Sequence, residues 1–420
     1  MHLLGPSLLL LEYLAFSDSN KWNFKHPDTL YAWEGACIWI PCSYKIPGSK
    51  DLMENLTVYH NYTYDENNKD YTGPIFYQKT KTGESHVQER IKFLGNRNSD
   101  CTLSIHPVQA QDSGQLGLRM TSEDDKWMEK IVLNVSKTAP PPRIQLPPEI
   151  QESEEVSVTC LLNFSCPGYE IKLNWFLDGS PQQTSVTSTS LTTMAVYTQS
   201  KLTFKPLWEN HGKNLTCQLW NDTAGGLLSQ ETVQLDVKHT PKLTIEVSPE
   251  EAIVTTGASV TMTCKILSSN PEVTNIRWLK DRTPVREPRR EQKTLTLTLS
   301  QVTKEMSGNY YCEAHNDIGS GKKQVTLQVH YAPEPSEVQI SPSPAKEGGT
   351  VVLTCVSPAN PPPTNYTWFH NTIKMTSKTS KVFHIPKVLL SHAGNYSCLA
   401  ENSVGPGLAG KKAELDVQCE

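Results

Sequence analysis

The sequence has no stretch that approaches the roughly 20 consecutive apolar residues that a transmembrane helix requires. Long helical patterns are absent too, and the short periodic runs are rich in Ser, Thr, Val, Tyr and Trp, which favours β-structure. Lys and Arg are scattered along the chain, and the net charge is −5. This distribution excludes the electrostatic footprint of a nucleic-acid-binding protein.

Motifs for catalysis and metal binding are missing as well. There is no Cys-x-x-Cys or His-x-x-x-His spacing, no phosphate-binding glycine loop and no Gly-x-Ser-x-Gly elbow. Asp112-Ser113-Gly114 resembles the catalytic triplet of aspartic proteases, but those enzymes need two such aspartates to share a proton. Because later repeats carry Ser307-Gly308 and Ala393-Gly394 at the same place, we interpret the triplet as a turn and expect no enzyme, no cofactor and no metal.

Cysteine, in contrast, is abundant and regularly spaced. Six of the 11 cysteines form three pairs, and a Trp follows the first member of each pair at a similar distance. The pairs are Cys160 and Cys217, Cys264 and Cys312, and Cys355 and Cys398, with Trp175, Trp278 and Trp368. In an immunoglobulin sandwich such a disulfide joins the two sheets and the Trp packs on it. Tyr310 and Tyr396, two residues before the second cysteine, add the tyrosine-corner signal, whereas the second unit has Leu215 there.

Proline-rich joints follow the last strand of each unit, as in Pro140-Pro141-Pro142 and Pro333-Glu334-Pro335. Proline just after a strand prevents further pairing and makes a short, stiff link. We therefore predict an all-β chain of four tandem immunoglobulin-like β-sandwiches, one V-type followed by three C2-type. The predicted domains are residues 18–137, 138–239, 240–331 and 332–418.

The amino terminus and the sequons predict the secretory pathway. Residues 1–17 hold a short leucine-rich run before Ala15-Phe16-Ser17, a small-x-small pattern typical of signal peptide cleavage, with a buried strand as the alternative. Asn-x-Ser/Thr sequons begin at Asn55, Asn61, Asn134, Asn163, Asn214, Asn221, Asn365 and Asn395. Their spread over the whole chain indicates a glycosylated ectodomain. We expect it at the plasma membrane as part of a longer receptor, or secreted as the chain stands.

The first domain departs from the repeat. Leu118 stands where the second cysteine of the pair would be, so Cys42 needs another partner, and Cys101 is the available one. That bond would join strands B and E of one sheet. Cys37 lies five residues before Cys42 and so points to the opposite face of a strand, and the second domain has a surplus Cys166. A Cys37–Cys166 bond would use both and hold the two domains together, although spacing alone does not decide connectivity.

The same alternation singles out Arg119. If Leu118 faces the core, Arg119 lies on the outer face of strand F. A solvated surface arginine is the alternative interpretation. Against it, several aromatic and apolar residues are expected nearby, at Trp22, Tyr64 and Trp127-Met128.

These features together resemble the Siglecs, the sialic-acid-binding immunoglobulin-type lectins. The displaced Cys42–Cys101 pair, the interdomain Cys37–Cys166 pair and the strand F arginine are that family's signature, and the resemblance extends along the whole chain, most closely to its B-lymphocyte branch. It implies that Arg119 pairs bidentately with the carboxylate of sialic acid. It also implies a preference for sialic acid linked α2-6 to galactose, and a role in B-cell adhesion and the regulation of antigen-receptor signalling.

The resemblance assigns further contacts. Trp22 would lie against the N-acyl group, and Lys126, Trp127 and Met128 would line the other side, with backbone hydrogen bonds from Lys126 to the glycerol tail. Candidate contacts with galactose are Tyr64, Asp125 and Lys130. Strand parity disagrees at one point: if Ile131 and Leu133 face the core, Trp127 points inward. Trp127 would then reach a ligand only from a bulged or broken strand, and the alternative for both tryptophans is a place in the core.

The expected partners are sialylated glycoproteins, in cis and in trans, with no nucleic acid and no metal. Sialylated glycans on neighbouring copies of the chain would also fit the site, which would give self-association. The alternative function is an adhesion module that binds protein through the same sheet face, with Arg119 as an ordinary hot spot and no dependence on sialic acid.

Overall fold

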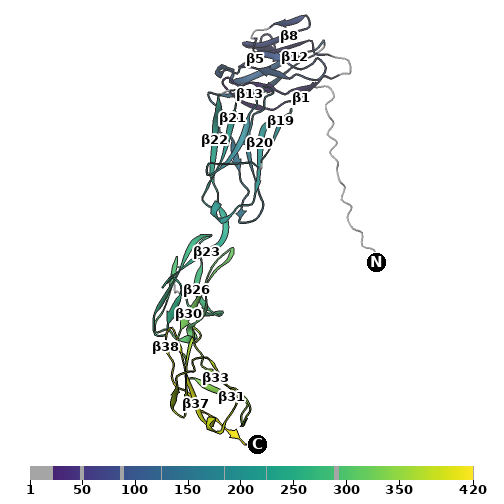
Figure 1. Cartoon of the computed structure of the whole chain (residues 1–420). Helices are drawn as coiled ribbons and strands as arrows, with labels where there is room; N and C mark the ends of the chain where they lie inside the picture. Colours follow the sequence, from purple (N-terminus) through teal and green to yellow (C-terminus); the bar gives the residue numbers. More distant parts are fainter. Residues whose placement is uncertain are drawn as a thin grey trace, which may run out of the picture. The chain divides into compact units, whose positions relative to one another are not determined.

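The computed structural model describes residues 22–47, 52–85, 89–123, 125–183, 185–223, 225–287 and 293–419. The predicted signal peptide, residues 1–17, lies outside these ranges. The chain divides into two compact units, Met1–Val237 and Lys238–Glu420, which run from purple to teal and from green to yellow in Figure 1. Over the described residues the chain is all β apart from single-turn 3-10 helices, and no helix in them could cross a membrane.

The first domain is a sandwich whose larger sheet carries the candidate site. That sheet has the strand order β2-β13-β12-β5-β8-β9, and it shares one core with the smaller sheet β10-β11-β3. Two further pairs, β1-β4 and the hairpin β6-β7, complete the domain. The strands are β1 (Asn23–Lys25), β2 (Thr29–Trp33), β3 (Ile38–Ile40), β4 (Ser43–Lys45), β5 (Asn55–His60), β6 (Thr63–Asp65), β7 (Asp70–Thr72), β8 (Ile75–Thr80), β9 (Gly83–Ser85), β10 (Ile91–Phe93), β11 (Leu103–Ile105), β12 (Gly114–Thr121) and β13 (Lys126–Ser136), with the helix η1 (Ala110–Asp112).

Strand β12 is buried on both faces. Leu118 and Met120 point into the core and are 0% exposed, as the alternation of a strand requires. On the outer face, Tyr62 lies across Gly117, where an added Cβ would come within 2.5 Å of the tyrosine ring. A larger residue at 117 would therefore push Tyr62 off the sheet.

Five disulfides fix the domains, and they are the pairs that the repeat and the resemblance predicted. They join Cys37 to Cys166, Cys42 to Cys101, Cys160 to Cys217, Cys264 to Cys312 and Cys355 to Cys398. The Cys42–Cys101 bond lies beside the paired strands β3 and β11 of one sheet, as expected. The remaining cysteine, Cys419, is free and exposed.

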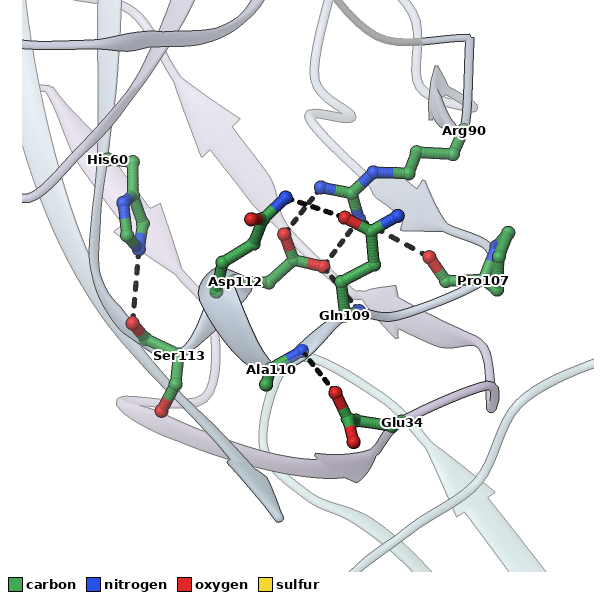
Figure 2. A network of polar contacts seen from close by, with 9 residues as sticks. Glu34, His60, Arg90, Pro107, Gln109, Ala110, Asp112 and Ser113 are labelled. Atoms are coloured by element: carbon green, nitrogen blue, oxygen red, sulfur yellow. Dashed lines mark hydrogen bonds and ion pairs between the residues drawn. The ribbon is translucent and has the colours of Figure 1, made fainter. Parts of the chain in front are cut away.

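The triplet Asp112-Ser113-Gly114 forms a turn, as interpreted from the sequence (Figure 2). Asp112 is fully buried, and both of its carboxylate oxygens accept hydrogen bonds from Arg90. The backbone N–H of Gln109 donates to the same carboxylate at 2.8 Å. A carboxylate with every oxygen bonded in this way holds the corner between strands and has no free oxygen for catalysis.

The other three domains have the predicted C2-type features. Trp175, Trp278 and Trp368 are at most 1% exposed. The hydroxyl of Tyr310 donates to the carbonyl of Met306 at 2.9 Å, and Tyr396 donates to His392 in the same way, which forms the predicted tyrosine corners.

The second domain pairs two four-stranded sheets, β14-β16-β20-β19 and β18-β17-β21-β22. Its elements are β14 (Arg143–Gln145), β15 (Ile150–Gln151), β16 (Val156–Leu162), β17 (Lys172–Leu177), β18 (Ser180–Gln182), β19 (Ser185–Leu191), β20 (Val196–Phe204), η2 (Trp208–Asn210), β21 (Asn214–Asn221) and β22 (Gly226–Gln234). This domain and the first belong to the same compact unit.

The second unit holds the third and fourth domains. The third has β23 (Val237–Ser248), β24 (Ile253–Thr255), β25 (Val260–Asn270), β26 (Asn275–Lys280), β27 (Thr283–Arg286), β28 (Thr294–Leu299), η3 (Lys304–Met306), β29 (Gly308–Asn316) and β30 (Gly319–His330). The fourth has β31 (Glu337–Ser341), β32 (Ala345–Lys346), β33 (Val351–Val356), β34 (Asn365–His370), β35 (Ile373–Met375), β36 (Val382–Ile385), η4 (Leu390–His392), β37 (Gly394–Asn402), β38 (Gly405–Pro406), β39 (Ala413–Leu415) and β40 (Val417–Gln418).

Candidate carbohydrate-binding site

The candidate site lies on the outer face of the six-stranded sheet in the first domain. Arg119 of β12 is opposite Met128 of β13 on one side and opposite Thr57 of β5 on the other. Because alternate residues of a strand share a face, Lys126 and Lys130 of β13 lie on the same side as Met128. The register therefore brings these three predicted residues to the face that carries Arg119.

Arg119 is covered on this face and not solvated. Its Nε lies 2.8 Å from Oδ1 of Asp70, and its Nη2 donates to Oδ2 of Asp70 at 3.0 Å. Asp70 is the first residue of β7, in the small hairpin β6-β7. The guanidinium and the carboxylate thus form a bidentate pair, which leaves the Arg119 side chain only 9% exposed.

A second cation binds the same carboxylate. Nζ of Lys126 donates to Oδ2 of Asp70 at 3.2 Å and to the carbonyl of Lys69 at 3.4 Å. Burial alone would raise the pKa of Asp70, but hydrogen bonds from Arg119, from the backbone of Tyr71 and from Lys126 outweigh it and lower the pKa to about 2. Asp70 is therefore ionised throughout the physiological range.

A depression of about 250 Å³ surrounds this ion pair. Its lining combines three basic residues and Asp70 with aromatic and apolar residues: Lys69, Asp70, Tyr71, Arg119, Lys126, Trp127 and Met128. Four of the ligand contacts predicted from the sequence thus line one depression: Arg119, Lys126, Trp127 and Met128. Its basic side chains and apolar edge have the chemistry that suits an anion.

Trp127 takes the inward direction that strand parity indicates. Strand β13 pairs with β12 through all eight residues of that strand without a register shift, and Trp127 stands opposite the core residue Met120. Its ring packs against the core of the first domain, and its indole N–H donates to Oε1 of Glu129 at 2.6 Å. The strand is neither bulged nor broken here, so the core-facing alternative describes the side chain, and contact with a ligand stays a prediction.

Trp22 and Asp125 bind each other. The Trp22 indole donates to Oδ2 of Asp125 at 3.0 Å, and its ring stacks on Phe24 and Tyr44. With only 5% of its surface exposed, Trp22 is a core residue in this arrangement. Asp125 also accepts the backbone N–H of Lys126 at 2.7 Å, which occupies the donor expected for a glycerol tail.

Tyr64 is 54% exposed on the hairpin β6-β7. Its ring meets Tyr71 edge-on at 5.1 Å, and Tyr71 meets Tyr62 edge-on at 5.5 Å. Since Tyr71 follows Asp70 directly, this aromatic group borders the ion pair. Lys130, the remaining predicted contact, is exposed on β13 opposite Gly117.

The sequence did not single out Asp70. It ends the polar run Asp65-Glu66-Asn67-Asn68-Lys69-Asp70, which reads as an ordinary hairpin turn. The turn is real: the Asp65 carboxylate accepts the backbone N–H of Asn67 at 2.9 Å. Only the folding of this hairpin against β12 distinguishes Asp70 from its neighbours.

Family comparisons match immunoglobulin models to four segments of the chain. A model described as "B-cell receptor CD22-like, first Ig-like" matches residues 32–137, and a CD80-like C2-set immunoglobulin domain matches residues 142–226. A general immunoglobulin domain model matches residues 240–316 and 335–402. The fold and these matches define a protein of tandem immunoglobulin domains.

Comparison with individual proteins narrows the class to which the chain belongs. The chain is 50% identical to the B-cell receptor CD22 of Mus musculus over 433 residues, covering 98% of this chain and 49% of the relative. It is 29% identical to the human myelin-associated glycoprotein, covering 93% and 62% of the two chains, and 29% identical to Sialic acid-binding Ig-like lectin 10 of Mus musculus, covering 89% and 58%. The chain belongs to the Siglec family, and within it resembles the CD22 type.

The chain spans about half the length of the mouse relative, at 49%. By name these relatives are a receptor, a glycoprotein and a lectin. Within the described part of the chain, no three His, Cys, Asp or Glu side chains are grouped to hold a metal ion.

Proposed function

We propose that the chain is a lectin that binds terminal sialic acid through Arg119. The observation that carries this proposal is the bidentate pair of Arg119 with a carboxylate, at 2.8 and 3.0 Å, on the outer face of the sheet. Sialic acid presents a carboxylate of its own, and a planar guanidinium matches its two oxygens. The name of one relative, Sialic acid-binding Ig-like lectin 10, supports the same ligand.

The surrounding residues suit the rest of a sialylated glycan. Lys126 adds a second positive charge beside Arg119, and Met128 offers an apolar edge. We assign the exposed Tyr64 and Lys130 to the next sugar, galactose, and propose the α2-6 linkage. By analogy with the mouse B-cell receptor CD22, the receptor would act in B-cell adhesion and in the regulation of antigen-receptor signalling at the plasma membrane.

The monovalent interaction should be weak. One charge-assisted pair contributes about 1.5–3 kcal/mol, and a shallow depression buries little of the ligand. A dissociation constant on the order of 0.1–1 mM corresponds to only about 4–5 kcal/mol. Useful binding to sialylated glycoproteins, in cis or in trans, therefore requires many copies, because effective concentration then compensates for the weak contact.

The chain's own glycans could act as cis ligands or crowd the site. Asn55 lies on β5 opposite Thr121, two residues before Thr57, so its sequon belongs to the face of Arg119. Removing sialic acid from the purified protein should then raise its binding to an added sialoside. Unchanged binding after sialidase treatment would argue against occupation in cis.

The main experiment compares three proteins on an array of sialosides and their desialylated counterparts. The whole chain is displayed as a multimer in the wild-type form, as Arg119→Ala, and as Arg143→Ala, a matched change at an exposed arginine of the second domain. We expect wild type and Arg143→Ala to bind sialylated glycans alone, with the linkage preference visible on the array, and Arg119→Ala to lose binding. Binding that ignores sialic acid, or that survives the loss of Arg119, would favour the protein-binding alternative.

A further inference from the structure

The carboxylate of Asp70 occupies the edge of Arg119 that suits a ligand carboxylate. Its two oxygens lie 2.8 Å from Nε and 3.0 Å from Nη2 of Arg119. One of them also accepts a hydrogen bond from Nζ of Lys126 at 3.2 Å. One internal carboxylate thus pairs with two of the three basic side chains that line the depression, Arg119 and Lys126. With 9% of its side chain exposed, Arg119 offers little further surface to a second anion.

Adding a second carboxylate beside Asp70 would bring two negative charges together at the same two cations. Like charges in close contact are unfavourable, above all where one of the cations is buried and poorly screened. Removing Asp70 first avoids this repulsion and returns both donors to the ligand. Exchange of one carboxylate for the other therefore fits the site better than addition.

The position of Asp70 also allows its carboxylate to separate from Arg119. Asp70 belongs to a two-stranded sheet of its own, formed by β6 and β7 with three residues each. An isolated hairpin of this kind has little stability by itself, so its position depends on contacts such as the Arg119 pair. The Asp70 side chain is 37% exposed, so water reaches it and can hydrate the carboxylate once it is released.

We propose that Asp70 is an internal competitor for Arg119, and that a sialic acid carboxylate binds by displacing it. This inference rests on the proposed function and adds the residue that sets the affinity. The hairpin β6-β7 then shifts or relaxes when ligand enters, and the cost of releasing Asp70 is part of the reason for weak binding.

The test is the affinity of Asp70→Asn for α2-6-sialyllactose, measured by titration calorimetry or NMR on the whole chain, with lactose as the unsialylated probe. Asparagine keeps the size of the side chain but removes the charge that holds Arg119 and Lys126. Because asparagine at this position completes an Asn-x-Thr sequon with Tyr71 and Thr72, wild type and all variants are produced in a host that adds no N-glycans. Because Asp70 is 37% exposed and regains hydration when it is released, the net gain from removing its charge is modest, and we expect binding about fivefold tighter than in wild type, or about 1 kcal/mol. A thermal melt checks that the variant is folded.

Two variants serve as controls. Asp65→Asn removes the same charge from the same hairpin, where Asp65 contacts Asn67 and Asn68 and not the arginine. It should leave the affinity near the wild-type value. Asp70→Glu keeps a carboxylate within reach of Arg119, so its affinity should stay closer to wild type than that of Asp70→Asn.

The outcomes separate this inference from the proposed function. Tighter binding by Asp70→Asn alone, abolished again by adding Arg119→Ala, would support displacement. If wild type binds the sialoside through Arg119 while Asp70→Asn binds equally or more weakly, Asp70 orients the arginine and the competitor proposal is overturned. If neither wild type nor Asp70→Asn binds any sialoside, the lectin function itself is wrong, and this inference is lost with it.

Discussion

Trp33 of the first domain packs against Phe164 of the second, with ring centroids 4.2 Å apart and ring planes tilted by 38°. Its indole donates to the hydroxyl of Tyr169 at 3.3 Å, and the ring belongs to the core cluster of the second domain. Together with the Cys37–Cys166 disulfide, this side chain makes the joint between the two domains a packed interior.

Trp33→Ala should therefore destabilise the joint strongly. The ring is 4% exposed, and truncating a buried Trp costs about 3–5 kcal/mol. Denaturant unfolding of the whole chain, followed by fluorescence, measures the loss. Tyr31→Ala is the control, because Tyr31 is 44% exposed on the same strand and should change the stability by less than about 1 kcal/mol. Equal effects of the two changes would contradict the packed joint.

The buried ion pair of the first domain predicts a second large effect. Asp112→Ala would leave the guanidinium of Arg90, which is 12% exposed, without its carboxylate. Breaking a buried pair from one side costs about 3–5 kcal/mol, so the denaturation midpoint should fall sharply. Glu34→Ala is a fair comparison, since the exposed Glu34 makes one hydrogen bond to the backbone of Ala110 nearby. It should cost less than about 1 kcal/mol. A small loss in Asp112→Ala would mean that the corner does not depend on this pair.

The sequence predicts the scaffold far better than it predicts the site. Local spacings such as Cys264–Trp278–Cys312 predict the disulfides, the buried tryptophans and the tyrosine corners. These spacings recur because each domain repeats the same order of strands. Strand parity even places Trp127 and Arg119 on opposite faces of the sheet. Asp70 escapes such reasoning because its importance depends on how a short polar hairpin folds over β12. That contact joins residues 49 positions apart and leaves no periodic signal.

The pair of His26 and Glu129 predicts how stability depends on pH. Nε2 of His26 lies 3.2 Å from Glu129, and this hydrogen bond raises the pKa of His26 although burial opposes it. Burial would raise the pKa of Glu129, but hydrogen bonds from His26 and Trp127 lower it. A raised histidine pKa stabilises the fold below about pH 6.5 and the benefit is lost as pH rises through the folded value. The lowered glutamate pKa stabilises the fold above about pH 4.5 and is lost below the folded value.

The pair should thus contribute most between about pH 4.5 and 6.5. Melting temperatures of wild type and His26→Asn, measured from pH 4 to 9, should differ most in that window and converge as the pH rises above it. His106→Asn, a change at an exposed histidine of the same domain, should show no such window. If the difference in melting temperature between wild type and His26→Asn instead grew towards pH 9, the His26–Glu129 pair would not be its cause.

Met128 and Trp127 are neighbours on β13 whose side chains should have different functions. Met128 lies beside Arg119 on the outer face, whereas Trp127 packs against the core. Met128→Ala should therefore weaken sialoside binding several-fold, because the apolar edge of the depression is lost, and should cost less than about 1 kcal/mol of stability. Trp127→Ala should cost about 2–3 kcal/mol of stability, since its half-buried ring leaves a gap against the core.

Titration of α2-6-sialyllactose, with unfolding curves for the same samples, measures both quantities. Because Trp127 also lines the depression, its substitution could change binding as well, and the informative quantity is the stability of each variant. Lys130→Ala provides a surface comparison on the same strand, with stability close to wild type. If Met128→Ala were the more destabilising of the two changes, Met128 would have to face the core and Trp127 the outer side of the sheet, towards the ligand. That result would require the bulged or broken strand that the regular β12-β13 register lacks.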